Sequence, residues 1–202
     1  NELLVDSEYF RDLNYQVETL TLSGYRFKEW QIQKREVIST TAIQQGSVWR
    51  YFDSGSLPAA VWVDTNFSDA PWLSGSAQLG YGDGDETTIV SYGSDANNKF
   101  ITTYLRKEFV VADASSIDGL RARVLFDDGV VVYLNGTEVF RNNLQTGTIN
   151  YSTLASQAIE NTNEFASFTI PNNLLANGKN VIAVEIHQVS PQSSDISFDF
   201  SL

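Results

Sequence analysis

Cysteine and methionine are absent from this 202-residue chain, and histidine occurs once. Without cysteine there can be no disulfide, no thiolate metal site and no cysteine nucleophile, and a single histidine excludes most histidine-based metal centres. No apolar run approaches the roughly 20 residues that a membrane-spanning helix needs. A cysteine-free composition is compatible with secretion from a bacterium.

Basic residues are also scarce, because 13 Lys and Arg stand against 25 Asp and Glu and give a net charge of −12. Binding to nucleic acid draws on basic side chains to neutralise phosphates, so this balance argues against nucleic acid and against anionic membranes as partners. Aromatic residues are plentiful at 12%, and hydrophobic residues reach 42%, which excludes a disordered chain. The composition indicates a folded, extracellular bacterial module.

The chain divides at about residue 45. It begins at Asn1 without a methionine or a signal peptide, as expected of a processed chain or an excised fragment. Residues 1–45 hold an amphipathic run followed by two strand-like runs, and we expect an added hairpin or the end of a preceding domain there. Residues 46–202 are expected to form one β domain.

The second part consists of short runs separated by Gly, Asn, Asp and Ser, which is typical of a sandwich or barrel and not of βαβ units. Alternation of apolar and polar residues predicts strands within 48–52, 100–111, 120–126, 165–170, 180–188 and 196–202. In the 100–111 run, Tyr104 and Arg106 fall on the polar face. The stretch Trp62–Tyr92 alternates little and is expected to form mostly long ordered loops, where function tends to reside.

A hairpin is the clearest local prediction. Asn135-Gly136 lies between an apolar run and a shorter one ending at Phe140. Both residues tolerate the positive φ of a two-residue type I′ turn. Just upstream, Asp127-Asp128 precedes a glycine, and adjacent carboxylates there suit a tight bend, a cation site, or both.

Four phrases occur in order along the second part: NFSDAPW at 66–72, TYLRKEF at 103–109, VVYLNG followed by EV at 131–139, and LLANGKNVIAV at 174–184. Their order and spacing resemble the sugar-binding jelly-roll domain at the front of glycoside-hydrolase-family-two enzymes such as β-galactosidases, and more widely the galactose-binding-like fold. The resemblance implies an all-β, two-sheet antiparallel jelly-roll sandwich. That fold serves as a carbohydrate-binding module, an adhesion domain or a scaffold beside a catalytic domain.

The phrase FDDGVVVYLNG at 126–136 has a second, local likeness. It resembles the protective-antigen-type domain of bacterial toxins and yeast adhesins, in which an Asp-Asp-Gly phrase precedes an aromatic strand and a hairpin. In the adhesins the paired aspartates hold calcium, so the resemblance implies a structural Ca²⁺ at Asp127 and Asp128. The alternative is that both aspartates cap the turn and accept backbone amides, because two carboxylates supply only part of the six to eight oxygens that Ca²⁺ takes.

Sugar sites usually combine an aromatic face with a few polar groups. The loop-rich stretch offers such a set as candidate ligand-binding residues: Trp62, Trp72, Tyr81, Asp83, Asp85 and Tyr92. Trp72 could equally be a buried plug at one end of the sandwich, and Trp49 is expected in the core. The acidic loop 82–86 could wrap a cation, contact sugar hydroxyls or simply be solvated.

No catalytic residue is predicted. The chain has no Gly-x-Ser-x-Gly motif, and its histidine, His187, is expected at an exposed or edge position beside Glu185. The sequence therefore predicts a non-catalytic module that binds a polysaccharide or other glycan, tethered to other domains of one parent chain outside the cell or at its surface. A scaffold or adhesion domain without a sugar site, and a polysaccharide-active enzyme whose acids are not located, are the alternatives.

Overall fold

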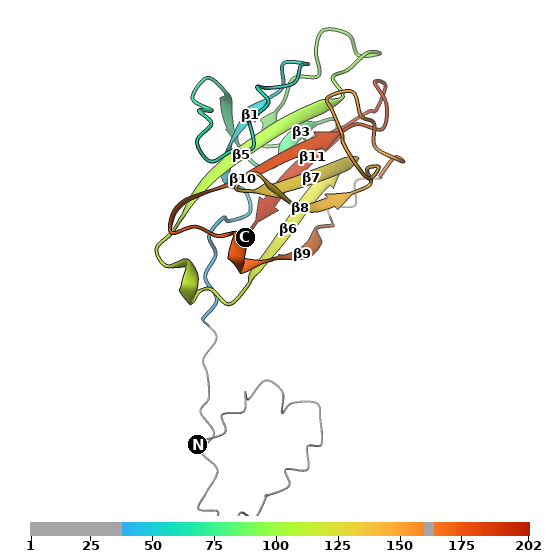
Figure 1. Ribbon diagram of the computed structural model, residues 1–202. Coiled ribbons are helices and arrows are strands. Elements are labelled where there is room, and N and C mark those ends of the chain that lie inside the picture. Colours follow the sequence, from blue (N-terminus) through green and yellow to red (C-terminus); the bar gives the residue numbers. More distant parts are fainter. Residues whose placement is uncertain (1–37, 160–163) are drawn as a thin grey trace, which may run out of the picture. The chain divides into compact units, whose positions relative to one another are not determined.

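The computed structural model describes residues 38–159 and 164–202 (Figure 1). Thr41–Leu202 form one compact unit. The β domain begins a few residues before Gly46, because Ile43 is buried in the core and its backbone pairs with that of Leu202. The predictions for residues 1–37, which make up most of the expected extension, lie outside the described residues.

Two sheets make up this unit, in which eleven strands are described. The six-stranded sheet has the order β2 (Leu73–Ser76), β1 (Val48–Phe52), β5 (Thr102–Val111), β10 (Gly178–His187), β7 (Gly129–Leu134) and β8 (Thr137–Asn142). The five-stranded sheet has the order β4 (Thr88–Ile89), β3 (Leu79–Tyr81), β11 (Ile196–Ser201), β6 (Leu120–Asp127) and β9 (Ala166–Ile170). All neighbours are antiparallel except β3 and β4. The predicted all-β, two-sheet sandwich is confirmed.

Helical structure in the described part is limited to two short 3-10 turns, η2 (Ala114–Ser116) and η3 (Asn172–Leu174). Neither has the length or the apolar character needed to cross a membrane. The prediction that Trp62–Tyr92 holds mostly loops is confirmed, although the short strands β2, β3 and β4 lie within it. Strands of two to four residues are too short to show a clear alternation.

The main core fills the space between the two sheets. Trp49 of β1 meets Phe198 and Phe200 of β11 edge-on, with ring centroids 4.9 and 5.7 Å apart. Edge-to-face contacts place the positive rim of one ring on the negative face of the other and add to the apolar area removed from water. All three rings are buried, which confirms the prediction that Trp49 belongs to the core.

A second apolar layer covers the outer face of the six-stranded sheet. Trp62 and Trp72, from the segment between β1 and β2, pack there against Tyr104 of β5 and Ala183 of β10. Trp62 meets Tyr104 edge-on at a centroid distance of 4.9 Å and stacks beside Trp72 at 6.3 Å. This face of the sheet is therefore an interior surface and not a solvated one.

The hairpin of β7 and β8 turns at Asn135 and Gly136, whose φ angles of 51° and 85° confirm the predicted turn. Asn135 also joins the hairpin to the neighbouring strand. Its Nδ2 donates to the Leu174 carbonyl at 2.9 Å and to Asn180 Oδ1 at 2.8 Å, and its Oδ1 accepts the Val181 amide at 2.9 Å. One side chain thus fixes both the turn and its docking on β10.

Replacing Asn135 by glycine tests this double role. Glycine adopts the positive φ freely but makes none of the three side-chain hydrogen bonds. We expect the free energy of unfolding to fall by about 2–3 kcal/mol, since each net hydrogen bond contributes about 1 kcal/mol. Denaturant unfolding measures this, and Asn98→Gly, at an exposed loop position, is the control; equal losses in both variants would contradict the docking role.

Candidate functional site

Neighbouring strands of the five-stranded sheet bring the predicted acidic residues to one end of the sandwich. Ser197 of β11 stands opposite Asp127 of β6 on one side and opposite Gly80 of β3 on the other. Partners in an antiparallel pair point to the same face of the sheet, so the side chains of Ser197 and Asp127 project together. Asp83 lies two residues after the end of β3 and accepts a hydrogen bond from Ser197 Oγ at 3.1 Å.

Asp128 makes the contacts expected of a turn cap. Its Oδ1 accepts the Ile159 amide at 2.8 Å, and its Oδ2 accepts the Val189 amide at 2.7 Å and the Ser193 hydroxyl at 3.3 Å. These donors come from two separate loops. Asp128 therefore holds both loops on the end of the sandwich, since each of its carboxylate oxygens accepts at least one hydrogen bond from them.

Asp127 is as deeply buried as its neighbour but has different contacts. It is 1% exposed, and no donor in the described part of the chain other than the neighbouring carboxyl of Asp128 reaches its oxygens. Burial, and next the carboxylate of Asp128, raise the pKa of Asp127 far above its usual range, with smaller contributions from Asp195 and Asp83. A buried carboxylate without donors is costly in its charged form.

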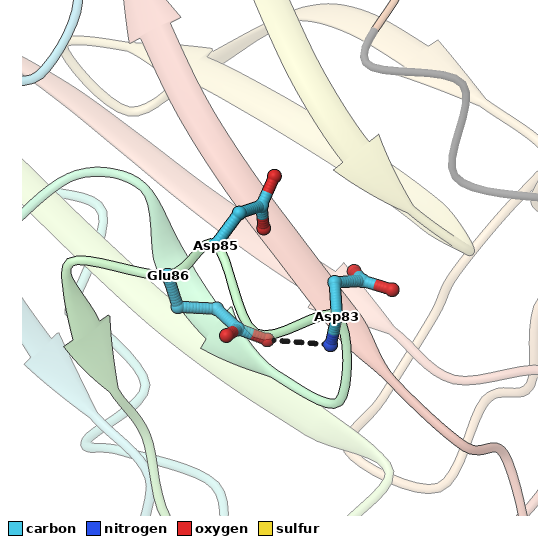
Figure 2. A group of neighbouring side chains, drawn as sticks. All are labelled: Asp83, Asp85 and Glu86. Carbon is cyan, nitrogen blue, oxygen red and sulfur yellow. Dashed lines mark hydrogen bonds between the residues drawn. The ribbon is translucent and has the colours of Figure 1, made fainter.

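The acidic loop after β3 carries three neighbouring carboxylates, those of Asp83, Asp85 and Glu86 (Figure 2). One carboxylate oxygen each of Asp83, Asp85 and Glu86 lies within 4.8 Å of the others. Glu86 turns back to accept the amides of Asp83 and Gly84, both at 2.9 Å, so it shapes the loop. Asp85 is exposed and accepts from Gln78 Nε2 at 3.0 Å.

The predicted aromatic platform is not exposed. Trp62 and Trp72 lie in the second apolar layer, and Tyr81 is buried with its hydroxyl accepting Gln188 Nε2 at 2.7 Å. Tyr92 is half-buried and meets Tyr81 edge-on at 5.1 Å. The burial of Trp62 and Trp72 has a simple cause: without them, Tyr104 and its neighbours on this face of the sheet would be in water.

Arg106 is the buried charge that sequence reasoning missed. Its guanidinium is fully buried on the outer face of β5, where Nε pairs with Asp69 Oδ2 at 3.0 Å. Nη1 donates to the Trp62 carbonyl, and Nη2 donates to the Asp64 carbonyl at 3.1 Å. Arg106 thus fastens the segment that carries both tryptophans to the sheet. Alternation assigned it to the correct face but gave no sign that the face is covered.

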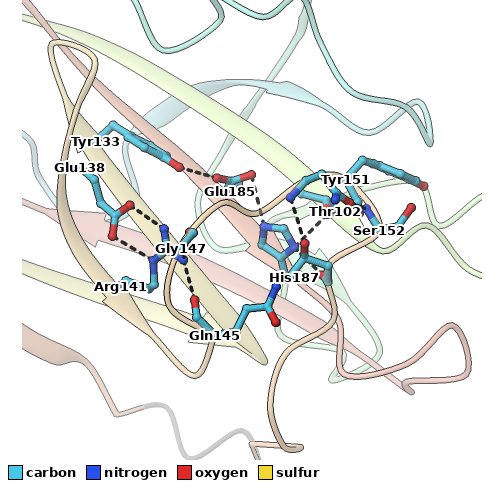
Figure 3. Close-up of polar contacts among 12 residues, drawn as sticks. Thr102, Tyr133, Glu138, Arg141, Gln145, Gly147, Tyr151, Ser152, Glu185 and His187 are labelled. Carbon is cyan, nitrogen blue, oxygen red and sulfur yellow. Dashed lines mark hydrogen bonds and ion pairs between the residues drawn. The ribbon is translucent and has the colours of Figure 1, made fainter.

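His187 also lies elsewhere than expected. It is fully buried at the end of β10, a strand with neighbours on both sides, and not at an exposed or edge position. Its Nδ1 contacts the Thr153 carbonyl at 2.8 Å, and its Nε2 lies 3.2 Å from Glu185 Oε2 (Figure 3). Glu185 Oε1 accepts the Tyr133 hydroxyl at 2.6 Å. This network fixes a loop onto the sheet.

No family model and no curated protein sequence matches the chain. Solved structures do match it: a glycosyl hydrolase family 2 member from Bacteroides cellulosilyticus has a TM-score of 0.48 at 15% identity, over 78% of this chain and 20% of that chain. Bacteroides uniformis β-glucuronidase has a TM-score of 0.47 at 15% identity, over 80% and 18%, and Bifidobacterium dentium β-glucuronidase has 0.45 at 14%, over 73% and 20%. The chain spans about a fifth of these structures. The likeness is too distant to carry an activity or a ligand to this chain.

Removing the Arg106 charge should release the segment that it fastens. Arg106→Met keeps an unbranched side chain but leaves Asp69 and two carbonyls without their donor, and we expect a loss of about 3–5 kcal/mol in the free energy of unfolding. Chemical denaturation measures this loss. Arg121→Met, at an exposed position of β6, removes the same charge as a control. A loss of less than about 1 kcal/mol at Arg106 would contradict the fastening role.

Proposed function

We propose that residues 41–202 form a non-catalytic carbohydrate-binding module of a larger extracellular bacterial protein. The supporting observation is that three loops, 82–86, 91–100 and 189–195, lie together at one end of the sandwich. We call this end the polar loop end. Hydrogen bonds tie the last two together, from the Lys99 amide to the Pro191 carbonyl at 2.9 Å and from Gln192 Nε2 to the Asn97 carbonyl at 2.8 Å. The loops are thereby ordered before any ligand arrives.

The exposed side chains at this end suit sugar hydroxyls. Asp85 offers carboxylate acceptors, and Asn97 and Gln192 offer amides. Tyr92 is half-buried beside them, with Lys99 Nζ 5.8 Å from its ring centroid. Pre-ordered loops reduce the entropy cost of binding, while the few polar groups keep affinity low. The acidic side chains repel anionic polymers, so the ligand is a neutral glycan.

A scaffold or adhesion domain without a sugar site is the second candidate. The burial of Trp62, Trp72 and Tyr81 favours it, because their flat faces are turned to the interior. In that case the polar loop end would only be a solvated surface beside other domains of the parent chain. The two candidates differ in whether the isolated chain retains any glycan.

A panel of neutral polysaccharides, presented to the 202-residue chain with and without calcium, separates them. We expect retention on at least one neutral glycan, and at least tenfold weaker binding by the double variant Asp85→Ala with Asn97→Ala, because both side chains are exposed acceptors or donors at the polar loop end. The matched control is Asp64→Ala with Asn66→Ala, an exposed acid and amide elsewhere. No retention in either condition would favour the scaffold, and turnover of a polysaccharide would favour an enzyme.

A further inference from the structure

Two arginines of β6 make no hydrogen bond or ion pair within the described part of the chain. Eight lysines and arginines lie in residues 38–159 and 164–202, and six of these donate hydrogen bonds to the fold: Arg50, Lys99, Arg106, Lys107, Arg141 and Lys179. Arg121 and Arg123 are exposed, and neither pairs with another residue of these ranges. Their charges stay unpaired although acids outnumber bases 25 to 13 in the chain.

Both arginines project from the outer face of the five-stranded sheet. They alternate along β6 with Ala122 and Val124, which are fully buried in the core. Alternate residues of a strand point to the same face and lie about 6.6 Å apart. The two guanidiniums can therefore reach one group, or two neighbouring groups of a polymer.

Hydroxyl groups flank the arginines on the neighbouring strands. Ser167 of β9 and Ser201 of β11 stand opposite Arg123, and Thr169 of β9 stands opposite Arg121. Cross-strand partners have their Cβ atoms about 5 Å apart, so the three hydroxyls lie beside the two guanidiniums. We call these five residues, Arg121, Arg123, Ser167, Thr169 and Ser201, the arginine face.

Phe165 restrains one of the guanidiniums. The Cζ atom of Arg123 lies 4.8 Å from the centroid of the Phe165 ring. A cation is attracted to the face of an aromatic ring, and this contact leaves the N–H groups of the guanidinium available to a ligand. Arg123 is thereby partly ordered before binding, which reduces the entropy cost of binding.

The arginine face offers hydrogen-bond donors and no negative charge. Guanidiniums donate only, in a planar fork that matches the oxygens of an anionic group, and the hydroxyls can donate as well. Further along the same face, Leu125 and Asp199 are each 4% exposed, and Asp199 already accepts the Gly46 amide at 3.1 Å. A ligand that fits this surface must supply acceptors and negative charge.

We propose that the arginine face binds an anionic polysaccharide through the sulfate or carboxylate groups of its sugar units. The face extends over three adjacent strands, β11, β6 and β9, so a charged polymer can lie across it. An acidic peptide would instead add to the backbone of the edge strand β9, which would place it two strand spacings, about 10 Å, from the arginines. The open face therefore favours the polysaccharide.

This surface is separate from the polar loop end. Asp127, at the end of β6, is four residues beyond Arg123 and six beyond Arg121, which corresponds to about 13 and 20 Å along an extended strand. Both distances exceed the Debye length of about 8 Å at physiological ionic strength, so the acids of the polar loop end repel an anion at the arginine face only weakly. The binding proposed here does not depend on the neutral-glycan site proposed above.

Dextran sulfate, carboxymethyl-dextran and unmodified dextran share one backbone and test the proposal on the 202-residue chain. At about 0.15 M NaCl, biolayer interferometry should show binding to at least one charged polymer and at least tenfold weaker binding to unmodified dextran. The stronger of the two charged polymers identifies the anionic group. Binding to neither charged polymer, or equal binding to all three, would overturn the proposal.

Arg121→Gln with Arg123→Gln locates the binding. Both positions are exposed, so we expect an unchanged melting temperature and at least tenfold weaker binding to the charged dextran, because its anionic groups lose their charged donors. Arg50→Gln with Lys179→Gln removes two positive charges from the other sheet and should leave the affinity within twofold of wild type. Equal weakening in both double variants would show that only net charge matters and would overturn the proposal.

Two further comparisons identify the partner and the surface. Poly-L-glutamate should bind at least tenfold more weakly than the charged dextran; equally tight binding that is lost in the arginine double variant would assign the face to an acidic peptide and overturn the proposal. Asp85→Ala with Asn97→Ala should leave binding to the charged dextran within twofold of wild type. A tenfold loss in that variant would place the anionic polymer at the polar loop end instead.

Discussion

The buried carboxylate of Asp128 constrains this end of the molecule more than any other single feature. It holds two loops in place by accepting an amide from each of them. Asp127, the last residue of β6, lies beside it and is equally buried, and this burial, together with the carboxylate of Asp128, raises the pKa of Asp127. Adjacent residues of the same type thus have different surroundings, because only Asp128 accepts the loop amides.

The sandwich positions this arrangement through long-range pairing. β3, β11 and β6 lie side by side, and their ends bring together residues that are more than forty positions apart in sequence. The six-stranded sheet is stabilised differently. Its outer face carries Arg106, and the segment that holds Trp62 and Trp72 packs over that face. The polar loop end is a described region where ordered loops present exposed carboxylates and amides together.

Local chemistry was sufficient to predict some of these features. The Asn135-Gly136 turn follows from two residues that tolerate positive φ. The apolar run 48–52 placed Trp49 in the core, and alternation placed Tyr104 and Arg106 together on the polar face of their strand. Alternation could not reveal what covers that face, because the covering segment, which contains Trp62 and Asp69, lies some forty residues upstream of Arg106. For the same reason His187 was expected near solvent, although a loop 34 residues away in sequence buries it. The pair Asp127-Asp128 was recognised, but their roles divide only through partners 31 and 61 residues distant.

The most direct measurement is the free energy of unfolding of Asp128→Ala, by chemical denaturation. The account predicts a loss of about 3 kcal/mol or more, because two loop amides and a hydroxyl lose their acceptor. A loss below about 1 kcal/mol would contradict it.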